Sequence, residues 1–217
     1  MELLSQFLDI VLHLDAHLLA LVQEYGVWIY AILFAIIFCE TGLVVTPFLP
    51  GDSLLFVAGA IAASGAMDVN LLVALLIVAA FAGDFTNYSI GRWLGTRFFT
   101  DRSSKLLNPE HLEKAHAFYE RHGGKAIIIA RFLPILRTYV PFVAGLAVME
   151  PRRFAFFNIV GGVVWVASLC YAGFFFGNIP WVKSNLTLII VGIIVVSLLP
   201  LVWAFVQSRL EARRVGT

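Results

Sequence analysis

The chain has 217 residues, 60% of them hydrophobic, and a formal net charge of only +1. Its mean hydropathy of +0.90 is far above that of a soluble domain, so the composition indicates an integral membrane protein folded as one bundle. The near-neutral charge excludes nucleic acid as a general partner. Cys39 and Cys170 both lie in apolar runs, which predicts two buried thiols and no disulfide framework.

The N-terminal segment mixes apolar and ionisable residues. Residues 3–23 carry Asp9, His13, Asp15 and His17, a pattern that favours an amphipathic helix lying in the membrane interface. His13 and His17 have metal-ligand spacing, but no third ligand is evident, so we expect an exposed pair and no metal. The segment lacks the basic region that begins a cleaved signal peptide, so we expect it to be retained.

Two acids interrupt the first strongly apolar region. Residues 27–39 are apolar, and we expect this helix to continue past Glu40 to the region of Pro47. Asp52 then follows a second proline, Pro50. A charge near the bilayer centre costs about 2.5–3.5 kcal/mol on insertion scales, so such a group usually faces a cavity or a partner. Both acids are therefore expected to lie in a polar site inside the membrane.

The next apolar segment is too short to cross a bilayer. Residues 54–66 are apolar and rich in small side chains, which favours one arm of a re-entrant hairpin over about 41–66. Residues 71–90 are long enough to span the membrane. Together these segments predict a first structural unit at residues 26–91, preceded by the amphipathic helix at 1–25.

The second half of the chain repeats this order. Residues 92–125 are polar and predict a helical cytoplasmic loop. Residues 126–149 then predict a second hairpin, within a second unit at 126–177, and a last span covers 186–207. The second hairpin is interrupted by two arginines and two prolines: Arg131, Pro134, Arg137 and Pro141.

Basic residues predict the orientation of the chain. The loop at 92–125, the pair Arg152 and Arg153, and the arginine-containing C-terminal tail are expected to be cytoplasmic. Both termini are then cytoplasmic, and the turns at 67–70 and 178–185 face the other side. These assignments agree with one another along the whole chain.

Short sequence strings recur in the same order. Residues 48–50 (Phe-Leu-Pro) recur at 132–134, and residues 56–59 (Phe-Val-Ala-Gly) recur at 142–145. One full crossing separates the two broken segments, so the second must enter from the opposite face. The sequence therefore predicts an all-α integral membrane protein with an inverted repeat of two opposed re-entrant helical hairpins plus transmembrane helices. Two Gly-x-x-x-Gly pairs also correspond and predict close helix packing: Gly91 with Gly95, and Gly173 with Gly177.

Several of these motifs together resemble the bacterial DedA family of inner-membrane proteins, over nearly the whole chain. They are Glu40-Thr41-Gly42, Phe48-Leu49-Pro50-Gly51-Asp52, Gly83-Asp84 with Tyr88 and Gly91-Arg92, and Arg131-Phe132-Leu133-Pro134 with Arg137-Thr138 and Gly145. The family shares its VTT (SNARE-associated) domain with eukaryotic lipid scramblases. The resemblance implies a role in recycling undecaprenyl phosphate, the lipid carrier of cell-wall synthesis, and in proton-dependent envelope homeostasis. It also implies functional acids at Glu40 and Asp52 and functional arginines at Arg131 and Arg137.

The two arginines suit a lipid phosphate. A proline-broken hairpin can bring Arg131 and Arg137 together, and a guanidinium fork binds phosphate through two hydrogen bonds while keeping its charge. Amides at broken helix ends would add affinity for anions. The structural alternative is that each arginine pairs with an acid and pins the hairpins. Proton coupling by Glu40 and Asp52 has a similar alternative, a static ion pair, and the sequence does not separate the two.

Asp84 and Tyr88 have two interpretations. In one, both residues extend the polar path; in the other, Asp84 caps a helix or pairs with an arginine.

Other functions compete with lipid transport. The leading hypothesis is a proton-coupled flippase for an anionic lipid, with membrane lipids and protons as partners. A proton-coupled exporter of small cations and a non-transporting envelope protein are the alternatives. No Ser-His-Asp, Walker or zinc signature occurs, so we expect neither an enzyme nor a cofactor, and a homo-oligomer stays open.

Overall fold

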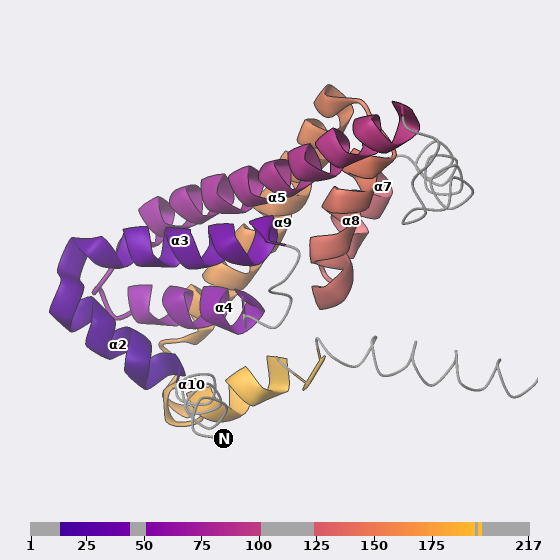
Figure 1. Ribbon diagram of the computed structural model, residues 1–217. Coiled ribbons are helices and arrows are strands. Elements are labelled where there is room, and N and C mark those ends of the chain that lie inside the picture. Colours follow the sequence, from indigo (N-terminus) through magenta and orange to yellow (C-terminus); the bar gives the residue numbers. More distant parts are fainter. Residues whose placement is uncertain (1–13, 44–50, 101–123, 194, 197–217) are drawn as a thin grey trace, which may run out of the picture.

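The computed structural model describes residues 14–43, 51–100, 124–193 and 195–196 (Figure 1). Within these ranges every regular element is a helix, as the composition predicts. Three helical runs are long and apolar enough to cross a membrane: His17–Gly42, Val69–Gly95 and Pro151–Phe176. The chain is therefore a multi-pass membrane protein of the all-α class.

Two long helices, α5 (Val69–Thr100) and α9 (Pro151–Phe176), form the centre of the bundle. At one end the Tyr171 hydroxyl donates to Asn70 Oδ1 at 2.8 Å. At the other end the rings of Tyr88 and Phe154 stack with their centroids 4.2 Å apart. The two helices therefore run antiparallel, and every other described part of the membrane bundle packs around them.

Helix α5 contains the predicted span at 71–90 and continues without a break into the polar segment, which the sequence also predicts to be helical. It runs through Gly91 and Gly95 as far as Thr100. Glycine lowers helix propensity, but here both glycines let another helix approach closely. The remainder of the polar segment, residues 101–123, lies outside the described residues.

The first proline-broken segment begins with α3 (Ile29–Gly42). The expectation that this helix continues to Pro47 is wrong, because it ends at Gly42 and Leu43 has an extended backbone. Glycine, the β-branched residues that follow and a proline all disfavour helix at this point in the sequence. Gly42 packs directly on the backbone of Gly83, so α3 ends near the middle of α5.

The segment continues with α4 (Gly51–Ala62), which starts three residues earlier than the expected arm at Leu54. Its 12 residues give a length of about 18 Å, against about 30 Å for the hydrocarbon core of a bilayer. All but one of its residues are buried, so α4 is enclosed by protein. The Gly51 amide donates to Glu40 Oε1 at 3.2 Å, which places the start of α4 beside the end of α3.

The second broken segment consists of α7 (Lys125–Ala130) and α8 (Pro134–Leu146). Three residues that include Arg131 separate the two helices, and Pro134 occupies the first turn of α8, where its missing amide hydrogen has no cost. The predicted hairpin at 126–149 thus contains two short helices. Figure 1 shows α7 and α8 at one end of the bundle and α4 toward the other.

Glycines make matching contacts in the two halves of the bundle. Between α4 and α9, a Cβ atom on Gly59 would collide with the Cys170 carbonyl, and one on Gly173 with the Phe56 carbonyl. Between α8 and α5, the equivalent collisions are of Gly145 with the Tyr88 carbonyl and of Gly91 with the Phe142 carbonyl. The predicted close packing at both Gly-x-x-x-Gly pairs is confirmed.

The remaining helices lie at the two ends of the chain. Part of the predicted interfacial helix is present as α2 (Leu14–Tyr25), which leads through the 3-10 turn η1 (Gly26–Trp28) into α3 and lies at an angle to it (Figure 1). After the short α10 (Pro180–Ser184), residues 186–193 are helical, and the rest of the expected last span lies outside the described residues.

The two cysteines differ in burial. Cys170 is buried against α4, as expected, whereas Cys39 is exposed, so the prediction of a second buried thiol is wrong. Cys39 lies on α3 between buried positions Ile37 and Glu40, and an apolar run in a membrane helix also supplies the face that meets lipid.

Candidate functional site

Arg137 lies at the centre of a buried cluster with two carboxylates. From α8, its Nη1 donates to Asp52 Oδ1 at 2.8 Å and its Nη2 to Glu40 Oε1 at 2.5 Å. Glu40 is in the last turn of α3 and Asp52 in the first turn of α4. The side chains of Arg137 and Glu40 are 3% and 0% exposed, whereas that of Asp52 is 18% exposed. One guanidinium fork therefore joins both ends of the first broken segment to the second.

The Glu40 carboxylate also accepts a hydrogen bond from Gly51, the first residue of α4. Its Oε1 accepts the Gly51 amide as well as Arg137 Nη2, so two donors converge on one oxygen. A Cβ atom at position 51 would collide with this carboxylate, which explains the need for glycine there. Amides in the first turn of a helix attract anions, so the arrangement is an anion-binding site that an internal carboxylate fills.

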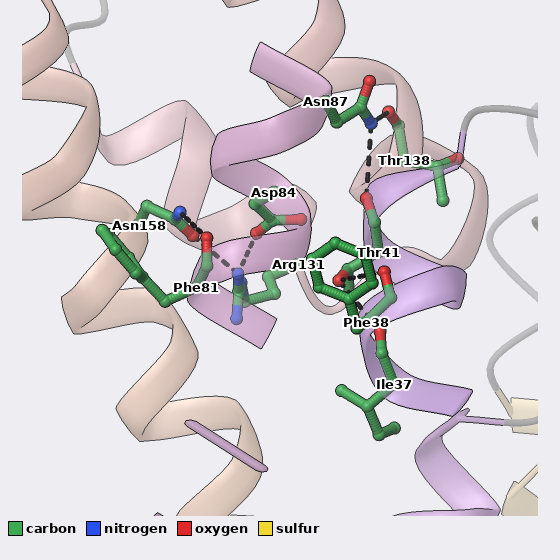
Figure 2. Close-up of polar contacts among 9 residues, drawn as sticks. All are labelled: Ile37, Phe38, Thr41, Phe81, Asp84, Asn87, Arg131, Thr138 and Asn158. Carbon is green, nitrogen blue, oxygen red and sulfur yellow. Dashed lines mark hydrogen bonds and ion pairs between the residues drawn. The ribbon is translucent and has the colours of Figure 1, made fainter. Parts of the chain in front are cut away.

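Arg131 forms a second buried cluster with residues of the two central helices. Its Nη2 donates to Asp84 Oδ2 on α5 and, at 2.7 Å, to Asn158 Oδ1 on α9. Asn158 Nδ2 in turn donates to the Phe81 carbonyl at 3.2 Å. Figure 2 shows Arg131 between Asp84 and Asn158. Both ion-paired side chains are 2% exposed, so this cluster is closed.

Trp165 connects the two clusters. Its ring centroid lies 4.7 Å from the Arg137 guanidinium carbon and 5.6 Å from that of Arg131. Its Nε1 donates to Asp52 Oδ1 at 2.8 Å. The contact of Trp165 with both arginines was not predicted from the sequence. The available signal was its position in the middle of a 26-residue span, away from the ends where interfacial tryptophans lie.

Asn87 links three elements next to the clusters. Its Nδ2 donates to the Thr138 carbonyl of α8 at 2.7 Å and to the Thr41 carbonyl of α3 at 3.4 Å (Figure 2). Thr41 Oγ1 donates back to the Ile37 carbonyl at 2.9 Å. An amide side chain inside an apolar helix indicates a position that faces the interior of the bundle. Both Asn87 and Asn158 could have been found from the sequence in this way.

Asp84 and Tyr88 have separate positions. Asp84 belongs to the Arg131 cluster, so its pairing with an arginine is one of the two alternatives that the sequence left open. The Tyr88 hydroxyl instead donates to the Met149 carbonyl, and Arg92 Nη1 donates to both of these oxygens at 2.8 Å. Tyr88 therefore fastens the link between α8 and α9, and among the described residues it makes no hydrogen bond or ion pair with either cluster.

The two predicted acids pair with the same arginine. Glu40 and Asp52 both contact Arg137, whereas Arg131 pairs with Asp84 of α5. The arginines still lie close together, over one indole ring.

The clusters retain unused hydrogen-bonding capacity. Within the part of the chain that the structure describes, five buried polar atoms have no hydrogen-bond partner: Glu40 Oε2, Asp84 Oδ1, Asn87 Oδ1, Arg131 Nη1 and Arg137 Nε. Each such group costs about 1–3 kcal/mol when it is left unsatisfied. The described residues contain no group of three or more His, Cys, Asp or Glu suited to a metal ion. These five atoms could hydrogen-bond to a polar ligand.

A groove of about 450 Å³ reaches the Arg137 cluster from the side. Asp52 and Trp165 form its polar lining. The other lining residues are apolar or small: Phe132, Leu169, Ile189, Gly192, Ile193 and Val196. The groove thus joins an apolar surface, formed by α9 and by Ile189, Gly192, Ile193 and Val196, to the one carboxylate of the clusters that is partly exposed.

Comparison with known proteins identifies the family. The VTT domain matches residues 49–175. Protein DedA of Escherichia coli strain K12 is 55% identical over 218 aligned positions, which cover 100% of both chains. Inner membrane protein YqjA of the same strain is 39% identical over 180 residues, covering 83% of this chain and 81% of the relative. An uncharacterized membrane protein of Mycobacterium leprae is 46% identical over 165 residues, covering 76% of this chain and 74% of the relative. No solved structure matches the chain. The chain belongs to the DedA family of membrane proteins, which carry the VTT domain.

Proposed function

We propose that the protein moves undecaprenyl phosphate, an anionic lipid carrier, across the bacterial inner membrane, and that this movement is coupled to protons. The observation that carries the proposal is the Arg137 fork, held between two carboxylates beside an apolar groove. A phosphate monoester can accept hydrogen bonds from a guanidinium fork, as these carboxylates do. Its hydrocarbon chain needs an apolar surface leading to the charge.

In this proposal the phosphate takes the place of the internal acids. Arg137 and the Gly51 amide would bind the phosphate oxygens that replace the Glu40 carboxylate. Arg131 would contribute its Nη1, which has no partner among the described residues, while its Nη2 keeps Asp84. Both guanidinium groups stay charged in a low-dielectric site, as an arginine does and a lysine often does not.

Displacement of the acids supplies the proton coupling. A buried carboxylate that loses its arginine carries an unpaired charge. This charge costs about 3–5 kcal/mol unless the carboxylate takes up a proton. Glu40 is fully buried and Asp52 faces the groove, so Asp52 is suited to exchange protons with the outside and Glu40 to hold one inside. Proton uptake on phosphate binding and proton release on phosphate departure would then link lipid movement to the gradient.

The proposal includes an inverted repeat of two re-entrant hairpins that meet at the site. Its support is the paired packing, because the contacts of α4 on α9 correspond to those of α8 on α5, glycine for glycine. The short length of α4 and the end of α3 near the middle of α5 also favour a chain that enters and leaves by one face. We further propose that both termini are cytoplasmic, following the basic residues.

One observation favours a second candidate function. Among the described residues the two clusters contain three carboxylates but only two arginines, and an excess of buried acid suits a small cation. A proton-coupled cation exporter would bind its substrate on Glu40 and Asp52. Transport by such an exporter would survive Arg137→Lys and fail in Glu40→Gln. Arg137→Lys separates the two candidates, because it is expected to abolish transport of a lipid phosphate.

Equilibrium binding tests the leading proposal. Purified protein in nanodiscs is titrated with a radiolabelled polyprenyl phosphate, with the corresponding uncharged polyprenol as the control ligand. The wild type is expected to bind the phosphate and not the alcohol, and Arg137→Lys to lose at least about tenfold in affinity, because it cannot form the paired hydrogen bonds. Equal affinity for phosphate and alcohol would remove the basis of the proposal.

A further inference from the structure

The groove beside Asp52 is lined mostly by apolar side chains. Those of Leu169, Ile189, Ile193 and Val196 are aliphatic. Its polar lining is Asp52 together with Trp165, whose Nε1 donates to that carboxylate. Arg137 does not line the groove but donates to Asp52 at 2.8 Å. The apolar surface therefore adjoins a buried positive charge that an acid covers.

Asp52 is the exposed member of an otherwise closed set. The other ion-paired side chains of the clusters, Glu40, Asp84, Arg131 and Arg137, are all at most 3% exposed, against 18% for Asp52. Among the described residues, Asp52 is thus the point at which the clusters open onto the groove. A ligand that reaches Arg137 from this groove must pass the pair formed by Asp52 and Trp165.

We propose that this groove holds the hydrocarbon chain of a lipid whose phosphate reaches Arg137 past Asp52. The inference rests on the proposed function and names the route and the tail-binding surface. Charge complementarity selects the occupant, since a single-chain lipid with an anionic end fits an apolar wall that adjoins a guanidinium group. The Trp165 side chain then acts as a positioning residue, because it holds Asp52 at the groove until the phosphate replaces it.

Gly192 offers a way to fill the groove without disturbing the fold. It lines the groove, and a Cβ atom there would meet nothing within 4 Å. Gly192→Trp should therefore occupy the space of the lipid chain. Val191→Trp is the matched control, because Val191 is the neighbouring residue, is exposed and does not line the groove.

The test compares a long and a short ligand with the same head group. Binding of a C55 polyprenyl phosphate and of farnesyl phosphate is measured in nanodiscs for the wild type and both variants, after thermal unfolding has verified their folds. Gly192→Trp is expected to weaken C55 binding by about tenfold or more, because the chain loses a buried apolar surface. Its effect on the short ligand should be smaller, and Val191→Trp should change neither by more than about twofold.

The outcomes separate the two levels of the argument. If the wild type binds neither phosphate, the proposed function itself is wrong. If the wild type binds and Gly192→Trp binds the C55 ligand as tightly as Val191→Trp does, the phosphate site stands and the groove is not its tail site. A C55 phosphate with a photoreactive group on its chain gives an independent readout. It should label Ile189, Ile193 or Val196, and labelling confined to other helices would overturn the inference.

Discussion

The two arginines occupy different kinds of site although both are buried. Arg131 is held by Asp84 and Asn158, which belong to the two central helices, and the whole cluster is closed to the outside. Arg137 is held by two acids at the ends of short helices, and one of these acids opens onto a groove. The comparison teaches that burial of a charge does not by itself assign a function. The two ion-pair clusters differ in accessibility instead, because the Asp84 partner of Arg131 is closed to the outside whereas Asp52, a partner of Arg137, is 18% exposed.

The largest expected effect follows from breaking the closed cluster. Arg131→Ala leaves Asp84 buried without its partner, and loss of one member of a buried pair costs about 3–5 kcal/mol. We expect a large decrease in the thermal unfolding temperature in detergent, and lipid binding to be lost with it. The double variant Arg131→Met/Asp84→Leu removes both charges and should recover much of the stability. Wild-type stability in the single variant would remove the distinction between the clusters.

The next effect separates function from fold at the open cluster. Arg137→Lys keeps the charge beside Glu40 and Asp52, so unfolding should change by no more than about 1–2 kcal/mol. The loss of the planar fork should abolish transport of a lipid phosphate. Arg131→Lys is the matched control and is expected to lose more stability, because its fork joins Asp84 to Asn158. The comparison fails if the two lysine variants behave alike in both assays.

Substitutions that remove the charge of the acidic residues sharpen the comparison further. Glu40→Gln and Asp52→Asn retain shape and should leave a folded protein in which lipid movement no longer responds to a pH gradient. In the wild type, proton uptake accompanies phosphate binding, so binding should strengthen as the pH falls. Asp84→Asn should weaken the fold instead. Wild-type gradient dependence in both Glu40→Gln and Asp52→Asn would rule out this coupling.

The smallest effect concerns the residue that both clusters share. Trp165→Phe keeps an aromatic ring beside the two arginines, removes the hydrogen bond to Asp52 and leaves a small cavity at a buried position. We expect a loss of about 1–2 kcal/mol in the free energy of unfolding from the hydrogen bond and the cavity together. The free energy of unfolding of both proteins is measured by denaturation in a mild detergent. A loss as large as that of Arg131→Ala would mean that Trp165 supports the fold in another way.

Much of the fold follows from sequence pattern. Apolar length predicts the spans within α5 and α9, and proline with charge predicts that residues 126–149 do not form a plain crossing. Helix ends were less predictable. α3 ends at Gly42, where β-branched residues and a proline follow in the sequence, whereas α5 continues through Gly91. Both glycines pack closely on a neighbouring helix, so the same residue type has opposite outcomes and the glycine alone does not predict a helix end.

The site was predictable by residue but not by pairing. Each of the four predicted charged residues, Glu40, Asp52, Arg131 and Arg137, lies in one of the two clusters. Their pairing depends on how far each helix is rotated about its axis, which periodicity does not define for helices that are apolar on every side. For the same reason the role of Trp165 could not be read from its sequence neighbours.

Transport by purified protein in liposomes tests the central claim most directly. A labelled C55 polyprenyl phosphate is incorporated in one leaflet, a pH gradient is imposed in either direction, and its appearance in the other leaflet is followed. The account predicts movement that depends on the direction of the gradient in the wild type and in Val191→Trp, and none above the protein-free rate in Arg137→Lys. Movement by Arg137→Lys equal to that of the wild type, or no movement by the folded wild type, would contradict it.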